Sequence, residues 1–286
     1  MTISIDASSG ASRKRRLPRF TPYEWSVFVV VAFLLLLAVF GPMLAPASIY
    51  RSDVLNTLAP PSAEHWLGTD DQGRDVAWRL VAGAQLSLLG SILVVILYSI
   101  IGMIIASLAV IGPKWLDEVL MRVTDIKIAL PGLVAALGLA TVLGPSLQSG
   151  VIALGLTAWP LTTRILYTTM RQTMAQPFVE GAQVLGASKL RLMWKHVIPN
   201  SLDPLVIKWA DDVSHTLLVL SGLSFVGVGA QPPSPEWGAM ILSGRSSMVT
   251  AWWTVAAPGA AIAVSAVAFG LLADILQTRR DPLLRH

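Results

Sequence analysis

Residues 83–111 decide the fold class, and they read GAQLSLLGSILVVILYSIIGMIIASLAVI without a charged side chain. A helix that crosses a bilayer needs about 20 predominantly apolar residues, because hydrocarbon offers no partner to an unpaired backbone amide. This stretch is longer than that minimum. The sequence therefore predicts a transmembrane helix here and, with it, an all-α membrane protein.

The composition of the whole chain supports a membrane location. Hydrophobic residues make up 54% of the 286 residues and charged ones only 13%, whereas soluble proteins carry about 25% charged residues. A soluble enzyme of this composition would expose large apolar patches. The net charge of +4 does not indicate a nucleic-acid partner, because the Lys and Arg residues lie between apolar runs and form no single basic face. The expected surroundings are membrane lipid.

Five further spans are expected on either side of this stretch. They cover residues 25–45, 119–143 and 148–170, a segment between 202 and 229, and a segment between 251 and 276. Residues 144–150 (GPSLQSG) separate the third and fourth spans, because Gly, Pro and Ser favour turns. Pro131 and Pro160 are expected to kink the third and fourth helices.

The distribution of Lys and Arg predicts the orientation. Cytoplasmic loops of membrane proteins carry an excess of these residues, and here they concentrate on one side if both termini are cytoplasmic. The chain then divides into a basic cytoplasmic tail (1–24), a first transmembrane helix (25–45), an extracytoplasmic segment (46–82), a five-helix core (83–276) with a cytoplasmic loop (171–200), and a cytoplasmic tail (277–286).

The sequence of that cytoplasmic loop predicts two short helices. Pro177 suits the first turn of one helix, where Glu180 favours the positive helix end. Gly186 is a typical helix stop, Ser188 can cap a second short helix, and Pro199 is expected to end it.

An apolar face is expected on the first of these helices, because Phe178, Ala182 and Leu185 recur at helical spacing. Such a face either inserts into a groove of a partner protein or lies on lipid headgroups, where the neighbouring basic residues supply attraction. Spacing alone leaves both alternatives open.

The loop also carries a family motif. Glu180-Gly181-Ala182, followed by Gly186 and by Ile198-Pro199, resembles the E-A-A-x3-G loop of the permease subunits of bacterial ABC importers. In that family the loop forms coupling helices that dock on separate ATP-hydrolysing subunits. The resemblance implies coupling roles for Glu180, Gly181, Ala182, Gly186, Ala187 and Pro199. Gly181 departs from the usual Ala, and Gly inside a helix costs about 0.5–1 kcal/mol relative to Ala.

Three further segments narrow the resemblance. Residues 65–75 (HWLGTDDQGRD), 223–238 (LSFVGVGAQPPSPEWG) and 252–282 resemble the second, C-type permease of dipeptide, oligopeptide and nickel importers. The resemblance implies a type I ABC importer permease in the bacterial inner membrane. The implied partners are a second homologous permease, two ATP-binding subunits and an extracytoplasmic substrate-binding protein. ATP and Mg²⁺ belong to the ATPase subunits in that family, so no cofactor is expected in this chain, and the solute stays open between dipeptide, oligopeptide, nickel and another cargo.

The same segments also have a local interpretation. Asp70, Asp71 and Asp75 lack the ligand order of a calcium loop and are expected to stabilise a tight turn, with Arg74 paired to a neighbouring acid. Three tryptophans are typical of an interfacial aromatic belt: Trp237, Trp252 and Trp253.

The fifth span carries a stripe of ionisable side chains, Lys208, Asp211, Asp212 and His215, on one face of a helix. Lys208 with Asp212 and Asp211 with His215 are four residues apart, which permits pairing within the membrane. In one interpretation the stripe lines the translocation pathway as a net acidic wall suited to a cationic group. In the other, the apolar span begins near Val213 and the charges lie at the interface.

No enzymatic motif was found. The sequence contains no P-loop, no H-E-x-x-H and no G-x-S-x-G, which are the motifs of nucleotide binding, zinc peptidases and serine hydrolases. We therefore expect no catalytic residue and no metal site, and a transport subunit in place of an enzyme. Two rival classes remain: an ion-coupled carrier that acts alone, with the span-five charges as its ion site, and a structural membrane scaffold.

Overall fold

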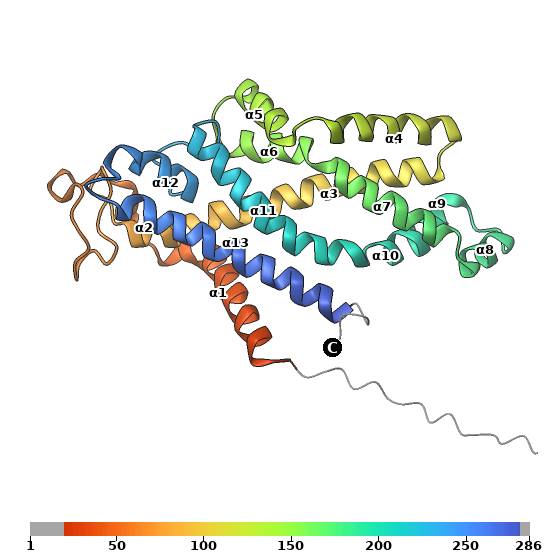
Figure 1. The fold of residues 1–286 in the computed structure, drawn as a ribbon, viewed down its shortest axis with the longest axis horizontal. Coiled ribbons are helices and arrows are strands. Elements are labelled where there is room, and N and C mark those ends of the chain that lie inside the picture. The colour runs from red at the N-terminus through yellow and green to blue at the C-terminus, as the bar shows by residue number, and fades with distance from the viewer. Residues whose placement is uncertain (1–19, 281–286) are drawn as a thin grey trace, which may run out of the picture.

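Helices build residues 20–280, the part of the chain that the computed structural model describes (Figure 1). Within these residues, extended backbone pairs at a single bridge between Thr69 and Asp75. The predicted all-α fold is confirmed. Of the two predicted tails, residues 1–19 and 281–286 lie outside the described residues.

Helix α1 (Pro22–Leu44) covers the first predicted span. It begins with a capping box, in which Glu24 N–H donates to the Thr21 hydroxyl at 3.2 Å and Thr21 N–H donates to the Glu24 carboxylate at 2.6 Å. Arg279, at the end of α13 (Trp253–Arg280), donates to the same carboxylate at 2.7 Å. The first and last helices are therefore joined at one end.

The central helix runs from Val76 to Ile111 as α2 (Val76–Ala84), a π-helical turn (Gln85–Leu89) and α3 (Gly90–Ile111). This helix begins before the uncharged run of residues 83–111, because other parts of the protein form hydrogen bonds with the polar groups of its first turns. The Asp75 carboxylate accepts from Trp78 N–H at 3.0 Å. The buried Arg79 guanidinium donates to the carbonyls of Ile49 and Pro233 at 3.1 to 3.2 Å.

The kink predicted at Pro131 is confirmed, and it is sharp enough to divide the helix predicted over residues 119–143 in two. Helices α4 (Lys114–Ala129) and α5 (Gly132–Leu143) meet at a bend of 92°. Pro131 explains this break, because proline lacks the amide hydrogen of the helical bond and restricts the residue before it. Helices α6 (Leu147–Thr157) and α7 (Trp159–Met174) are likewise separated at Ala158, close to Pro160.

The remaining helices complete the chain. They are α8 (Pro177–Val184), α9 (Lys189–Leu192), a π-helical turn (Met193–Val197), α10 (Ile198–Ser201), α11 (Asp203–Val226) and α12 (Trp237–Gly244), followed by α13. By length and apolar character, three described helices qualify as membrane spans, namely α1, the central helix and α13, and the bent α4–α5 pair adds a fourth if it counts as one span. The six-span count therefore stays a prediction.

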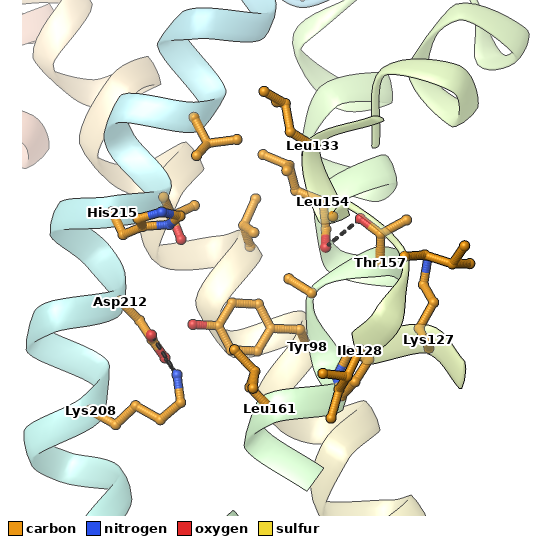
Figure 2. Close-up of a pocket in the computed structure, with 17 residues that line it drawn as sticks. Tyr98, Lys127, Ile128, Leu133, Leu154, Thr157, Leu161, Lys208, Asp212 and His215 are labelled. Atoms are coloured by element: carbon orange, nitrogen blue, oxygen red, sulfur yellow. Dashed lines mark hydrogen bonds and ion pairs between the residues drawn. The ribbon is translucent and has the colours of Figure 1, made fainter. Parts of the chain in front are cut away.

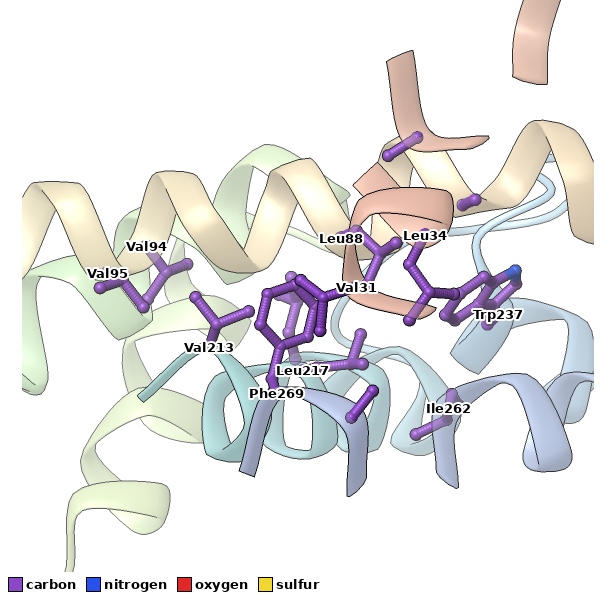
Figure 3. Packing of buried hydrophobic residues seen from close by; sticks show 14 of the residues in the cluster. Val31, Leu34, Leu88, Val94, Val95, Val213, Leu217, Trp237, Ile262 and Phe269 are labelled. Atoms are coloured by element: carbon purple, nitrogen blue, oxygen red, sulfur yellow. The ribbon is translucent and has the colours of Figure 1, made fainter. Parts of the chain in front are cut away.

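Two apolar clusters hold the helices together. In the larger one, Val31 of α1, Leu88 and Val94 of the central helix, Leu217 of α11 and Phe269 of α13 pack together (Figure 3). The smaller one joins α3 and α7 to the segment before α11: its buried members include Val110, Met170, Met193, Val197 and Leu205. Because packing drives helix association in lipid, these contacts fix the loop after α7 to the transmembrane helices.

A polar cap closes the end of the molecule that lies opposite α8 and α9 (Figure 1). The Asp70 carboxylate accepts from the backbone N–H groups of Gln72 and Arg74 at 2.9 Å and from Arg74 Nε at 2.7 Å. The predicted turn and the local pairing of Arg74 are confirmed. The described residues contain no cluster of His, Cys, Asp and Glu that could hold a metal ion.

Two of the three predicted belt tryptophans belong to this cap instead. Trp237 is buried and donates its indole N–H to the Leu80 carbonyl at 3.0 Å, and Trp253 donates to the Thr69 carbonyl at 3.0 Å. Trp252 alone of the three is exposed. The belt interpretation is wrong for Trp237 and Trp253, because each indole N–H has a protein partner and needs no interface.

Glu236 fixes α12 within the cap. Its fully buried carboxylate accepts from Gly238 N–H at 3.0 Å and Ala239 N–H at 2.9 Å, which caps the helix. The hydroxyls of Ser87 and Ser221 donate to the same carboxylate at 3.3 Å. One side chain therefore links α12, the central helix and α11.

Candidate functional site

The charged stripe on α11 contains one closed ion pair. Lys208 Nζ donates to both carboxylate oxygens of Asp212, at 2.5 and 2.7 Å. The two side chains are only 19% and 13% exposed, and Nζ lies 5.9 Å from the centre of the Tyr98 ring of α3. The predicted Lys208–Asp212 pair is confirmed, and its two charges largely cancel.

The second predicted pair does not form. Asp211 and His215 are both exposed, and within residues 20–280 they share neither a hydrogen bond nor an ion pair. Helical spacing places the two residues one turn apart but does not fix their rotamers. The stripe therefore divides into a paired half and an open half.

A cavity of about 420 Å³ lies beside this stripe (Figure 2). Residues from four helical regions line it: Val94 and Tyr98 of α3; Lys127, Ile128, Leu130, Gly132 and Leu133 around the α4–α5 bend; Leu154, Thr157, Ala158, Pro160 and Leu161 around the α6–α7 break; and Lys208, Asp212, His215, Thr216 and Val219 of α11. Residues on both sides of the two helix breaks therefore contribute to the wall opposite α11.

The charge of this lining differs from the prediction. Asp211 does not line the cavity, whereas Lys127 does. Two lysines therefore face one aspartate, and the lining is net positive by one charge with His215 neutral. The lining of this cavity therefore differs from the predicted acidic wall, because Asp211 is not part of it and Lys127 of α4 is. The acidic wall of the translocation pathway stays a prediction.

Lys127 was not recognised from the sequence as a candidate. It lies inside the predicted span 119–143, and only the α4–α5 bend brings it across from Asp212 (Figure 2). Spacing along one helix reveals neighbours on that helix only. The available signal was a Lys four residues before Pro131, at the start of a long uncharged run.

The candidate coupling loop has the helix–turn–helix form that was predicted. Helix α8 begins with Pro177 in its first turn, and Gly186 adopts a left-handed φ of 85° directly after it. The Ser188 hydroxyl accepts from Arg191 N–H at 3.4 Å and caps α9. Gly181 lies inside α8, where a Cβ would meet nothing within 4 Å.

The loop turns one apolar side inward and another outward. Val179, Leu192 and Met193 are buried, and Met193 belongs to the cluster that contacts α3 and α7. The outward side is exposed and apolar, with Val184 87% and Leu185 89% accessible, and it also includes Phe178, Leu190 and Trp194. This surface, which we call the α8–α9 apolar patch, has no cover in the described part of the chain.

The six predicted coupling residues do not all lie on this patch. Glu180 and Gly181 are exposed on α8, Gly186 forms the turn, and Ala182 and Ala187 are partly buried beside it. Pro199 does not end the second helix as predicted. It occupies an early position of α10, and the π-helical turn before it absorbs the missing amide bond.

Comparison with known proteins agrees with this architecture. Residues 98–286 match the family described as "Binding-protein-dependent transport system inner membrane component". A probable D,D-dipeptide transport system permease of Escherichia coli K12 is 37% identical over 92% of this chain and 88% of its own length. A dipeptide transport system permease of the same strain is 38% identical (90% and 88%), and one of Alkalihalophilus pseudofirmus is 34% identical (90% and 84%).

Solved structures show the same fold. The MetNI methionine ABC transporter, in an inward-facing conformation, superposes with a TM-score of 0.57 at 15% identity, covering 71% of this chain and 97% of that one. An amino acid ABC transporter gives 0.54 at 18% identity, with 70% and 94% covered.

The helical fold, its apolar spans and its loop of short helices define a polytopic permease of the type I ABC importer class. The chain belongs to the family of binding-protein-dependent transport system inner membrane components. It is a multi-pass protein of the bacterial inner membrane and a transport subunit, not an enzyme. Such a component works with ATPase and membrane partners, which favours an importer over the ion-coupled carrier.

Proposed function

We propose that this chain is one of two different permease subunits of an ATP-driven importer of di- or oligopeptides, and that the pair encloses the translocation pathway. The observation that carries the substrate class is the similarity to relatives named for dipeptide transport, at 34% to 38% identity over nine-tenths of the chain. The fold alone does not select a cargo, because similar structures transport other solutes.

In this proposal, one of the two ATP-binding subunits docks on the α8–α9 apolar patch, and the other docks on the second permease. The patch suits the helix-in-groove mode of recognition, in which exposed apolar residues at helical spacing fill a groove of the partner. Its inward side packs through Met193 and Val197 on Met170 of α7 and Val110 of α3. A movement of the patch therefore reaches α7 and the central helix through packed side chains.

The pathway runs beside α11, past the cavity between Asp212 and Lys127. Closure of the ATPase subunits moves α8 to α10, and rigid helices carry this movement to the cavity, whose access alternates between the two sides of the membrane. A substrate-binding protein delivers the peptide at the polar cap around Asp70 and Glu236. ATP and Mg²⁺ are held by the ATPase subunits.

Transport in proteoliposomes tests the proposal. The chain is purified together with the permease and ATPase subunits that assemble with it and is supplied with the binding protein, and uptake of radiolabelled dialanine and trialanine is measured. We expect accumulation that requires ATP and the binding protein. Accumulation driven by a proton or sodium gradient without the ATPase subunits would overturn the proposal in favour of an ion-coupled carrier.

A further inference from the structure

The cavity beside α11 has one cation without a counter-ion. Of its two lysines, Lys208 is engaged by both oxygens of Asp212. Lys127 is half-buried, and among residues 20–280 its amine has neither an ion pair nor a hydrogen bond. The nearest acid along α4, Asp125, is paired with Arg164 of α7. Among the described residues that line the cavity, Lys127 is therefore the one Lys or Asp whose charge has no partner.

An unpaired charge among apolar groups favours a ligand of opposite sign. The rest of the lining is mainly apolar, including Leu133, Leu154 and Leu161. In such a lining, a few polar groups fix the orientation of a bound molecule, and an ionisable residue within the membrane marks a functional site by default. Asp212 is not available to a cationic group, because Lys208 already occupies both of its oxygens.

We propose that Lys127 recognises the carboxylate of the transported solute, and that the cavity selects cargo by an anionic terminus. The inference rests on the proposed peptide function, because every linear peptide presents a terminal carboxylate whatever its side chains. Lys127 holds that carboxylate from the α4–α5 bend, while the apolar lining accepts side chains without regard to sequence. Among the described residues that line the cavity, no unpaired acid is available to the amino terminus, because Asp212 is held by Lys208.

The absence of cysteine from the sequence allows a test that does not depend on transport. A single reporter, Leu161→Cys, is placed on the exposed part of the lining within the assembled importer. Its rates of modification by a sulfonate-bearing and a trimethylammonium-bearing methanethiosulfonate are compared. We expect the anionic reagent to be favoured and this preference to fall about tenfold in Lys127→Gln, the size expected for loss of one close charge interaction.

Matched variants isolate the effect. Lys127→Arg retains the charge and should retain the preference. Lys114→Gln removes a lysine from the exposed start of the same helix, away from the cavity, and should leave the ratio unchanged. A second reporter, Leu55→Cys in the exposed segment before the central helix, should not respond to Lys127→Gln. An unchanged ratio at Leu161→Cys in Lys127→Gln overturns the inference.

Uptake by the same variants tests recognition of the cargo. With saturating binding protein, dialanine uptake should fall about ten- to a hundredfold in Lys127→Gln, as for loss of a hydrogen bond to a charged group, and should persist in Lys127→Arg and Lys114→Gln. Normal uptake by Lys127→Gln, despite a lowered labelling ratio, overturns the carboxylate role. If the unmodified importer moves no peptide, the proposed function has failed, and the labelling ratio alone decides the anion preference.

Discussion

Gly186 is the residue whose backbone shape most directly sets the form of the coupling loop. Its φ of 85° lies in the left-handed region, which costs a residue with a Cβ about 1–2 kcal/mol and costs a β-branched residue most. A Cβ at this position would meet no atom within 4 Å. A substitution there therefore acts through backbone strain and not through a clash.

Replacing Gly186 with Val is expected to leave the complex assembled but to uncouple ATP hydrolysis from transport, because the angle between α8 and α9 changes. The ratio of peptide transported to ATP hydrolysed, measured in proteoliposomes, should fall several-fold. Gly181→Ala is the matched control: this glycine lies inside α8 with open space around it, so Ala should stabilise the helix by about 0.5–1 kcal/mol and retain coupling. Equal coupling in Gly186→Val and Gly181→Ala would contradict a role for the turn.

Asp211 and Asp212 are neighbours in sequence with different surroundings, and this difference gives a second prediction. In Asp212→Asn the half-buried ammonium group of Lys208 loses its negatively charged partner. Removal of one partner from a buried ion pair costs about 3–5 kcal/mol. The cost here is smaller, because both side chains keep some exposure to solvent. We expect lower thermal stability and reduced uptake. Asp211→Asn should resemble the unmodified protein in thermal melting and in uptake, and similar losses in the two variants would show that the pairing is not what matters.

At the scale of helices, α4 is tied to α7 by two ionic contacts. Asp117 of α4 pairs with Arg171 and accepts from the Tyr167 hydroxyl at 3.0 Å, and Asp125 pairs with Arg164. Helix α7 leads directly into α8, and α4 carries Lys127. The two helices therefore form one unit that connects the coupling loop with one wall of the cavity.

Breaking both contacts should loosen this unit. We expect Asp117→Asn with Asp125→Asn to retain ATP hydrolysis while peptide uptake falls, because movement of α8 no longer reaches the α4 wall. Exposed ion pairs are individually worth about 0.2–1 kcal/mol, so the change in melting temperature should be small. In a second variant, Asp117→Asn is kept and the charges of the other pair are exchanged, Asp125→Arg with Arg164→Asp, which restores one contact. If this variant recovers no uptake relative to the double variant, the linkage between α4 and α7 is contradicted.

The helices also show how far the sequence could be used. Long uncharged runs predicted α1, the central helix and α13, because a membrane span needs length and apolar character and little else. Pro131 predicted a break, but neither its angle of 92° nor the facing of Lys127 towards α11. The belt interpretation of Trp237 failed for a related reason, since its carbonyl partner, Leu80, is far away in sequence. The length of apolar runs and the positions of prolines predicted where most helices lie. The cavity could not be predicted in this way, because it depends on contacts between helices that are far apart in the sequence.

For the whole molecule, the predicted orientation is open to direct measurement. The lack of cysteine makes single reporters interpretable. In intact spheroplasts, Leu55→Cys, which is 96% exposed in the segment before the central helix, should react with a membrane-impermeant maleimide. In spheroplasts of cells that lack the ATPase subunits, Val184→Cys should react only after the membrane is opened. The reverse pattern would place the coupling loop on the outer side and remove the basis for docking to ATPase subunits.

The unbroken helix of 36 residues from Val76 to Ile111 joins the polar cap to the cluster beneath the coupling loop. At 1.5 Å per residue it is about 54 Å long. A rod of this length works as a lever: a tilt of about 5° at its inner end displaces its outer end by roughly 5 Å, about the pitch of one helical turn. A change of structure at one end of this helix is then expected to change the structure at its other end, because both ends belong to one rigid element.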